Sequence, residues 1–211
     1  MEKKLSRTEA KKARNYAALL NAGKELFAEK GFQNTTIRDI TDYCDVGYGT
    51  FYLYFDSKEM LLDKAVDEFA QSLIEYKSVR VIKGLSIRER MYYGTKDILE
   101  FAHENRKFLK MICMISNTNT ESATIADKVW SKIFDRMFSD HSYFMKKGYT
   151  KEDISLETVS WKIYGWTLKG IIEGIVSNDI QREEIDKLSK IYADMNYLTF
   201  IREEVQSQDI Q

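Results

Sequence analysis

The sequence predicts an all-α fold in two parts, a three-helix segment at the N-terminus and a longer helical bundle after it. The 211 residues include no proline, and the 10 glycines stand mostly at predicted helix ends, which is typical of helices joined by short connections. Apolar residues recur every three or four positions, the spacing of one helix face. With 44% apolar and 31% charged residues, the composition indicates a soluble globular protein and not a disordered chain. About nine helices are expected, over residues 9–30, 37–43, 47–53, 57–82, 86–103, 105–117, 122–147, 155–177 and 182–204.

Residues 35–58 predict two short helices joined by a tight turn, followed at once by the start of a third helix. Thr36 is a good N-cap, and Asp39 stands at the reciprocal position of a capping box, so a helix is expected to start at Ile37. Gly47 and Gly49 disfavour one long helix through this stretch. The pattern is therefore a helix-turn-helix.

The second short helix is expected to turn Phe51 inward and to leave Tyr48, Thr50 and Tyr52 on the outer face. Ser57 then caps the next helix. Because the second helix of a helix-turn-helix enters the major groove of DNA, these outer side chains are candidates for contact with DNA.

The later helices carry apolar stripes of different widths. Residues 57–82 have one stripe along a helix long enough to couple two domains, and Ser86 with Glu89 forms a capping box that opens the next helix. Residues 155–177 are apolar around most of the circumference, which predicts burial on more than one side. Residues 182–204 supply a partner stripe.

The order and spacing of the N-terminal residues resemble the DNA-binding domain of the tetracycline-repressor (TetR) family of bacterial transcription regulators. The resemblance covers about 46 residues, so it is far more specific than a single short motif. The matching residues are Arg14, Leu19, Leu20, Ala22, Leu26, Phe27, Gly31, Phe32, Thr35, Thr36, Ile37, Asp39, Ile40, Val46, Gly49, Thr50, Phe51, Tyr52, Tyr54, Phe55, Ser57, Lys58 and Glu59.

Three residues depart from the family pattern. Asp45 stands at the turn position usually held by glycine, and aspartate tolerates a left-handed backbone better than most residues. Gly47 replaces the serine that usually caps the recognition helix, at a cost of a few tenths of a kcal/mol. Gly23 replaces an alanine inside the first helix, at a cost of about 1 kcal/mol. These changes weaken the domain slightly without contradicting the resemblance.

The resemblance implies a DNA-binding domain over residues 1–55 and an effector-binding and dimerisation domain over residues 56–211. Within the first domain, Arg38, Tyr48 and Thr50 are the candidates for contact with base edges, since arginine suits guanine and the threonine methyl suits thymine. The candidates for contact with phosphate are Thr36, Tyr52 and Lys58.

The second domain is rich in aromatic residues and methionine, which leave irregular gaps between helices that suit an apolar or aromatic ligand. The resemblance implies the same, because helices of the C-terminal domain enclose an effector pocket in this family. We therefore expect a repressor that a small molecule releases from a palindromic operator. The predicted pocket residues are Phe101, Phe108, Met111, Met114, Trp130, Phe134, Trp161 and Tyr164.

A homodimer is expected, with its interface built from residues 155–177 and 182–204. Glycines within the first of these helices permit close approach of two backbones. The predicted interface residues are Gly170, Ile171, Gly174, Leu188, Tyr192 and Met195.

The charge distribution fits a nucleic-acid partner although the net charge is only −1. Residues 1–15 carry six basic and two acidic side chains, and such a basic arm can follow phosphates or enter a minor groove. The N-terminus lacks an apolar signal core and no apolar run is long enough to span a membrane, so the protein is expected in the cytoplasm. Cys44 and Cys113 are the only cysteines, which excludes a disulfide framework.

The sequence contains neither a phosphate-binding glycine loop nor a nucleophile elbow, so no enzyme activity and no cofactor is expected. Glu100 and His103 have the spacing that di-iron bundles use, but such a site needs a second copy, and the other histidine, His141, follows Phe138 by three positions. Two other classes remain open here: a helical DNA-binding or protein-interaction module without an effector, and a metal-dependent helical-bundle enzyme.

Overall fold

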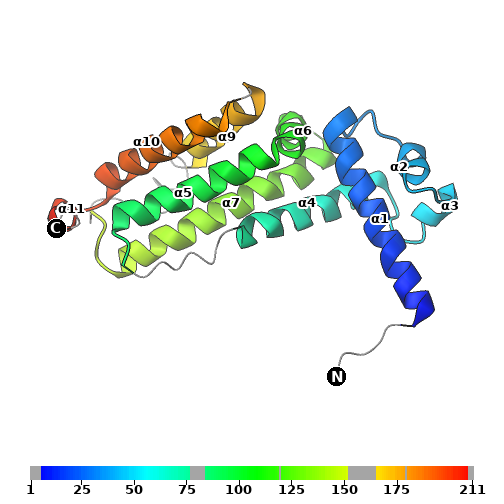
Figure 1. Cartoon of the computed structure of the whole chain (residues 1–211), viewed down its shortest axis with the longest axis horizontal. Helices are drawn as coiled ribbons and strands as arrows, with labels where there is room; N and C mark the ends of the chain where they lie inside the picture. Colours follow the sequence, from blue (N-terminus) through cyan, green and yellow to red (C-terminus); the bar gives the residue numbers. More distant parts are fainter. Residues whose placement is uncertain (1–5, 77–83, 119, 152–164, 179, 209–211) are drawn as a thin grey trace. The chain divides into compact units, whose positions relative to one another are not determined.

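The computed structural model describes residues 6–76, 84–118, 120–151, 165–178 and 180–208, and the side chains of residues 136–141, Trp166 and residues 207–208 also lie outside the described part. The regular elements in these ranges are helices (Figure 1), which confirms the predicted fold class. Their bounds are α1 Arg7–Lys30, α2 Ile37–Tyr43, α3 Tyr48–Phe51, α4 Lys58–Glu75, α5 Ile87–Glu104, α6 Arg106–Ser116, α7 Glu121–Lys146, α9 Gly165–Ser177, α10 Arg182–Phe200 and α11 Glu203–Gln208.

Local capping signals set the first residues of several helices. The Thr36 hydroxyl accepts a hydrogen bond from the Asp39 amide, and the Asp39 carboxylate accepts one from the Thr36 amide, so α2 begins at the predicted residue. The predicted box of Ser86 and Glu89 opens α5 in the same way. An unpredicted box at Ser6 starts α1 at residue 7, so the described part of the basic segment is helical, with exposed basic side chains at Arg7, Lys11, Lys12 and Arg14.

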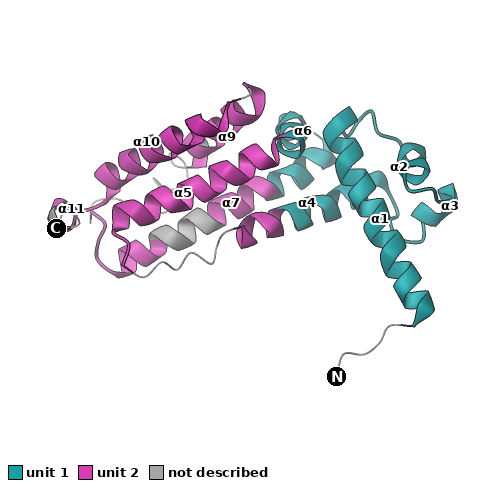
Figure 2. Cartoon of the chain, in the orientation of Figure 1, with its two compact units in different colours: residues 1–69, 107–128 teal, residues 70–106, 129–211 magenta. Residues whose placement is uncertain are grey.

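The chain divides into two compact units (Figure 2), here called unit 1 and unit 2. Unit 1 comprises residues 1–69 and 107–128, and unit 2 comprises residues 70–106 and 129–211. α4 and α7 each begin in unit 1 and end in unit 2. These units describe packing, so the functional boundary after residue 55 remains a prediction.

A glycine allows α1 and α4 to approach closely in the core of unit 1. A methyl group at Gly23 would overlap Cδ2 of Leu61, and its distances to the Cγ and Cδ1 atoms of Leu61 would be 3.3 Å. Leu61 is fully buried. The glycine that looked like a weak point in the sequence therefore leaves room for the Leu61 side chain. At the far end of unit 1, Lys128 of α7 forms ion pairs with Asp63 and Asp67 of α4.

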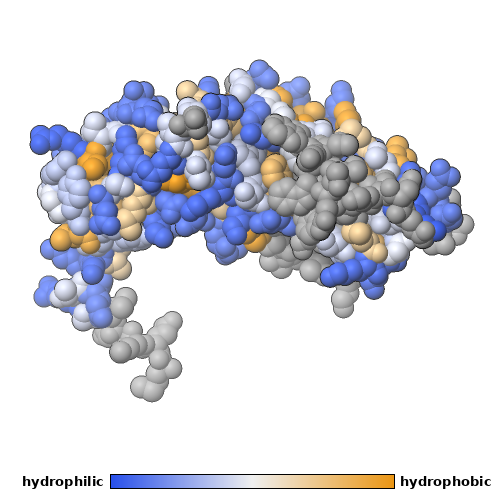
Figure 3. Space-filling view, turned by 180° about the vertical axis from the view of Figure 1, so that it is seen from behind, coloured by the Kyte–Doolittle hydropathy of each residue, from blue (hydrophilic) through white to orange (hydrophobic). Residues whose placement is uncertain are grey.

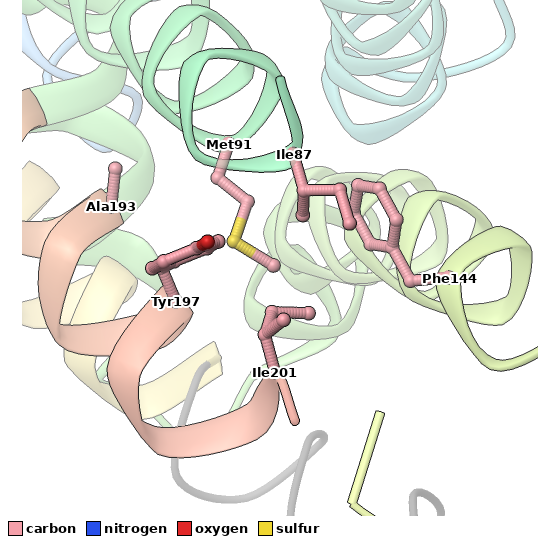
Figure 4. Packing of buried hydrophobic residues seen from close by; sticks show 6 residues of the cluster. All are labelled: Ile87, Met91, Phe144, Ala193, Tyr197 and Ile201. Atoms are coloured by element: carbon pink, nitrogen blue, oxygen red, sulfur yellow. The ribbon is translucent and has the colours of Figure 1, made fainter. Parts of the chain in front are cut away.

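Unit 2 is organised around α5 and α10, which run antiparallel. Arg88 Nε donates to Asp194 Oδ1 at 2.7 Å. Further along α5, the ammonium of Lys96 pairs with Asp186, which comes earlier in α10. The Tyr92 hydroxyl also donates to Asp186, at 2.5 Å. Between these helices and the end of α7 lies a buried apolar cluster (Figure 4), formed by Ile87, Met91, Phe144, Ala193, Tyr197 and Ile201.

The helix predicted over residues 182–204 is broken at Ile201. This residue has an extended backbone, with φ −85° and ψ 140°, and is fully buried in the cluster. The chain pairs there with the segment before it: the Lys151 amide donates to the Phe200 carbonyl at 3.0 Å, and the Arg202 amide donates to the Tyr149 carbonyl at 2.9 Å. Burial of Ile201 and these two hydrogen bonds replace the helical bonds that continuation would form.

Of the predicted helix over residues 155–177, the structure describes α9, which begins at Gly165. Leu168, Ile172 and Ile175 are buried, so one side of α9 faces the interior. No helix in the described part of the chain combines the length and the apolar character needed to cross a membrane. On the face drawn in Figure 3, hydrophilic residues surround small groups of hydrophobic ones.

Candidate DNA-binding surface

The recognition helix presents the side chains that the sequence predicts. Phe51 is fully buried, whereas Tyr48 and Tyr52 are 48% and 46% exposed. The helix is shorter than predicted and ends at Phe51, and a turn continues from it in which the Phe55 amide donates to the Phe51 carbonyl at 3.0 Å. α3 and its C-cap residue Tyr52 therefore present two exposed tyrosines beside the buried Phe51.

The turn before α3 has the left-handed residue that the sequence predicts. Asp45 has φ 53°, and it is the only residue other than glycine with a positive φ in the described ranges. The Asp45 amide donates to the Asp42 carbonyl at 3.2 Å, and the Val46 amide donates to the Thr41 carbonyl at 3.0 Å. These bonds fix the direction in which α3 leaves α2.

Arg38, Tyr48 and Tyr52 lie together on the exposed side of α2 and α3. The hydroxyl oxygens of Tyr48 and Tyr52 are 3.1 Å apart, and their rings meet edge to face with centroids 5.6 Å apart. The guanidinium carbon of Arg38 lies 6.0 Å from the centre of the Tyr48 ring, at the outer limit of a cation–π contact. Two predicted base-contact residues and one predicted phosphate-contact residue therefore form one cluster.

Lys58 points back towards the connection between α1 and α2. Its ammonium donates to the carbonyls of Phe32 at 2.8 Å and Thr35 at 2.9 Å, and lies 4.3 Å from the centre of the Phe32 ring. Partial burial lowers the pKa of this ammonium. A lysine in the first turn of a helix opposes the helix dipole, and the two carbonyls compensate for that position. One N–H of the three is left for the predicted phosphate contact.

Thr36 is also engaged within the protein. Its hydroxyl donates to Asp39 Oδ2 at 2.6 Å, and Lys30 donates to Asp39 Oδ1 at 3.1 Å. The hydrogen bonds from Thr36 and from Lys30 lower the pKa of Asp39 to about 2. Thr50 is half-buried on α3. Contact of either threonine with DNA remains a prediction.

The predicted effector residues fall into both units. Phe108 and Met111 are buried in unit 1, where Met114 is 67% exposed. Phe101 and Trp130 are buried in unit 2, and Phe134 of the same unit is half-buried. Trp161 and Tyr164 lie outside the described residues.

The predicted interface residues divide between the surface and the interior. Gly170, Gly174, Ile171, Leu188 and Met195 are at least partly exposed, and a methyl group on either glycine would meet no atom within 4 Å. Tyr192 is only 3% exposed, so its side chain faces the interior and is not available to a second copy. Its neighbour Ile191 is 56% exposed. The sequence prediction missed Ile191, although Leu188, Ile191, Met195 and Leu198 have helical spacing on α10.

Among the described residues, no group of three or more histidine, cysteine, aspartate or glutamate side chains is arranged to hold a metal ion. His103 lies in the last turn of α5, and the side chain of His141 is outside the described part.

Comparison with known proteins agrees with this geometry. The family model described as "Bacterial regulatory proteins, tetR family" matches residues 19–65, which run from the middle of α1 into α4. The transcriptional repressor KstR2 of Rhodococcus jostii strain RHA1 is 39% identical over 71 residues, or 33% of this chain and 34% of that protein. The match to KstR2 thus spans about a third of that relative's length.

Two other proteins match most of the chain. The transcriptional regulator UidR of Escherichia coli strain K12 is 25% identical over 186 residues, which cover 83% of this chain and 88% of UidR. The transcriptional regulator FadR of Bacillus subtilis, solved in complex with stearoyl-CoA, has the same fold, with a TM-score of 0.71 at 20% identity over 85% of this chain and 96% of that one. The matched residues 19–65 include the exposed Arg38 and Tyr48, the left-handed turn at Asp45 and the buried Phe51. Residues 19–65 therefore form a DNA-binding segment of the tetR family of bacterial regulatory proteins, and the rest of the chain is similar to transcriptional regulators of the same fold.

Proposed function

We propose that this chain is a cytoplasmic repressor that binds a palindromic operator as a homodimer and leaves it when a small effector binds to the C-terminal helices. The observation that carries the DNA-binding part is the exposed cluster of Arg38, Tyr48 and Tyr52 on the helix-turn-helix. A guanidinium and two phenol hydroxyls are side chains that hydrogen-bond to base edges and phosphates. The similarity to KstR2, a transcriptional repressor, supports the proposed direction of regulation.

Within this proposal, Arg38, Tyr48 and Thr50 contact base edges, and Thr36, Tyr52 and Lys58 contact phosphates. The exposed basic side chains on the first turns of α1 add sequence-independent attraction to the DNA backbone. Lys58 then has two functions, because it also binds the carbonyls of Phe32 and Thr35.

A two-fold dimer is supported by the exposed apolar side chains of α10. Ile191, Met195 and Leu198 are 56%, 43% and 60% exposed and lie at three- and four-residue spacing, next to the half-buried Leu188. Such a stripe on a helix is favourable only when another apolar surface covers it. A second copy is the partner that fits, because an isologous interface brings the same stripe from both sides and delivers two recognition helices to a palindrome. Gly170 and Gly174 of α9 extend the proposed interface.

An effector with an apolar or aromatic body and a hydrogen-bond acceptor is supported by the surroundings of Trp130. This side chain is 4% exposed, and its indole N–H has no acceptor among the described residues. The Lys169 ammonium lies 5.1 Å from the centre of the same ring. The Phe134 ring packs directly against Gly165, because a methyl group at position 165 would be 2.7 Å from Phe134 Cε1. That FadR was solved with stearoyl-CoA is consistent with a ligand that has a long apolar part.

The first experiment selects DNA from a pool of randomised duplexes with the purified wild-type protein. The proposal predicts an enriched inverted repeat whose half-sites lie about one helical turn, ~34–36 Å, or a multiple of it apart, with two chains bound per duplex in native mass spectrometry. Affinity should fall steeply with salt, since each phosphate contact releases counterions. A monomer at micromolar concentration, or no enrichment, would contradict it.

The second experiment screens small acidic and neutral aromatic or aliphatic compounds by the fluorescence of Trp130, Trp161 and Trp166. A ligand of the proposed kind should change the emission and weaken operator binding, and the operator should lower ligand affinity by the same factor. Lys169→Met should weaken ligands that carry an acceptor, with Lys187→Met, an exposed lysine on α10, as the control. Ligands that bind without altering operator affinity would leave a DNA-binding regulator without this mode of release.

A further inference from the structure

On the exposed side of the recognition helix, the sequence neighbours of Tyr48 are glycines and give its side chain no support. α3 has four residues, its N-cap Gly47 makes no side-chain hydrogen bond, and a side chain at Gly49 would meet no atom within 4 Å. Glycine at these positions leaves the backbone conformationally permissive. The orientation of Tyr48 therefore depends on what its ring and its hydroxyl contact.

Tyr52 supplies that contact, one helical turn away. Its ring packs edge to face on the fully buried Phe51, with centroids 5.4 Å apart, so it is anchored on the core. From this anchor it meets the Tyr48 ring edge to face, and its hydroxyl oxygen lies 3.1 Å from that of Tyr48. Residues four apart on a helix are neighbours, so both contacts are compatible with the turn.

In the hydrogen bond between the two hydroxyls, either Tyr48 or Tyr52 can be the donor. A phosphate bound to Tyr52 allows only one of these two arrangements. A phenol hydroxyl has one proton to donate and lone pairs to accept with, whereas a phosphate oxygen of DNA accepts only. If Tyr52 donates its proton to a phosphate, it must accept the proton of Tyr48. Tyr48 then has no proton left for the DNA, and its oxygen can only accept.

We infer that Tyr52 is a positioning residue, which orders the hydroxyl chain so that Tyr48 accepts a hydrogen bond from the exocyclic amino group of a base. In the major groove these groups are N6 of adenine and N4 of cytosine, whereas guanine and thymine present acceptors there. This inference rests on the proposed function and names the base chemistry that the proposed site reads. The guanidinium carbon of Arg38 lies 6.0 Å from the centre of the Tyr48 ring, so the direction of Arg38 towards a neighbouring base depends on the same ring.

The test uses the duplex selected by the wild-type protein and a set of copies in which single amino groups are removed. Each adenine is replaced in turn by purine and each cytosine by 2-pyrimidinone, analogues that keep the ring and lack the amino group. Binding is measured for wild type, Tyr48→Phe, Tyr52→Phe and the double variant. Tyr43→Phe is the matched control, because Tyr43 is an exposed tyrosine of the same unit whose hydroxyl donates to Glu25 on α1.

At one position per half-site, removal of the amino group should weaken wild-type binding on the order of tenfold. Tyr48→Phe should lose that discrimination, and so should Tyr52→Phe, although Tyr52 does not touch the base. The double variant should show no further loss of discrimination than either single variant, because both substitutions remove the same interaction. Tyr43→Phe should behave as wild type. Circular dichroism should be unchanged, since only exposed hydroxyls are removed.

Two results would overturn the inference while leaving the proposed function intact. One is a Tyr52→Phe variant that loses affinity equally for all duplexes and additively with Tyr48→Phe, which would make Tyr52 a phosphate contact alone. The other is full discrimination by Tyr52→Phe. Failure of the wild-type protein to enrich any duplex would instead overturn the proposed function, and the inference with it.

Discussion

The helix-turn-helix segment and helix α10 are stabilised by different kinds of interaction, although both are rich in apolar residues. In the first, individual side chains bind backbone groups: Thr36 and Asp39 cap α2, and Lys58 binds two carbonyls of the α1–α2 connection. In α10, the structure depends on which apolar face is buried. The neighbours Ile191 and Tyr192 have similar sequence environments, yet Ile191 is 56% exposed and Tyr192 is 3% exposed.

This difference explains why the structure of the helix-turn-helix segment is easier to predict from the sequence than the buried face of α10. A cap or a turn residue acts on atoms a few positions away, so its effect is encoded locally. The inward face of a helix with two apolar stripes depends on all the helices that pack against it. Substitutions in the two regions should therefore fail in different ways, and the following tests are given from the largest expected effect to the smallest.

Tyr192→Ala should destabilise the folded protomer by about 3–5 kcal/mol, because it removes a large buried side chain of α10. Ile191→Asp, one residue earlier, should leave protomer stability nearly unchanged and shift the dimer towards monomer. Urea unfolding and sedimentation measure the two effects. Gly170→Leu should behave like Ile191→Asp, since the structure has open space at that position. If Ile191→Asp lowers the stability of the protomer and Tyr192→Ala weakens only the dimer, the assignment of the two faces is reversed.

Lys58→Met should destabilise the protein by about 2 kcal/mol, because two carbonyls that now accept from an ammonium lose their donor. It should also weaken DNA binding nearly equally for all sequences. Lys24→Met is the matched control: its exposed ion pair with Glu68, at 3.3 Å, contributes about 1 kcal/mol or less. Equal unfolding midpoints for the two variants would show that Lys58 has no structural role.

Gly23→Ala should destabilise the protein by about 1 kcal/mol, although alanine is the better helix former. The added methyl overlaps Leu61, and overpacking costs about 1–3 kcal/mol, more than the gain of roughly 1 kcal/mol in helix propensity. Gly94→Ala in α5 is the control, because a methyl group there meets no atom within 4 Å, and it should be stabilising. Thermal and urea unfolding measure the stability of both variants. A Gly23→Ala variant that is more stable than wild type would show that Gly23 is only a weak point in α1.

Asp39 should make a small, pH-dependent contribution to the free energy of unfolding. Its pKa is lowered from 3.8 to about 2 in the folded protein, so the folded state favours the ionised carboxylate. The stabilisation is fully present above the ordinary pKa and is lost as the pH falls through the window between these two values. Asp39→Asn should flatten the stability profile in this window, whereas Asp42→Asn, an exposed residue of the same helix, should not. Parallel profiles for wild type and Asp39→Asn would contradict the capping role.

The features that local chemistry determines were predictable residue by residue. The start of α2 at Ile37, the left-handed Asp45 and the outward Tyr48 and Tyr52 all follow from caps, turn preferences and helical spacing, and the structure confirms them. The inward course of Lys58 was not predicted, because its partners are backbone carbonyls 23 and 26 residues away in the chain. Only the unfavourable position of a cation at a helix start signalled an additional partner.

The bundle was predictable in its helices but not in the assignment of its faces. Residues 182–204 contain two apolar stripes, and nothing in their spacing distinguishes the one that packs on α5 from the one at the surface. The break at Ile201 had no local signal either, since it depends on pairing with residues 149–151. The aromatic and methionine residues predicted for the effector fall into both units, and their role as a binding wall is still a prediction.

The most direct test of the central claim, sequence-specific recognition by the helix-turn-helix surface, compares wild type with Arg38→Ala on the selected operator and on a scrambled duplex over a range of salt concentrations. We predict that Arg38→Ala lowers the preference for the operator by about 1–3 kcal/mol at one base pair and leaves affinity for the scrambled duplex nearly as in wild type. The two proteins should also have similar salt dependence on the scrambled duplex. Equal preference of wild type and Arg38→Ala for the operator would contradict the account.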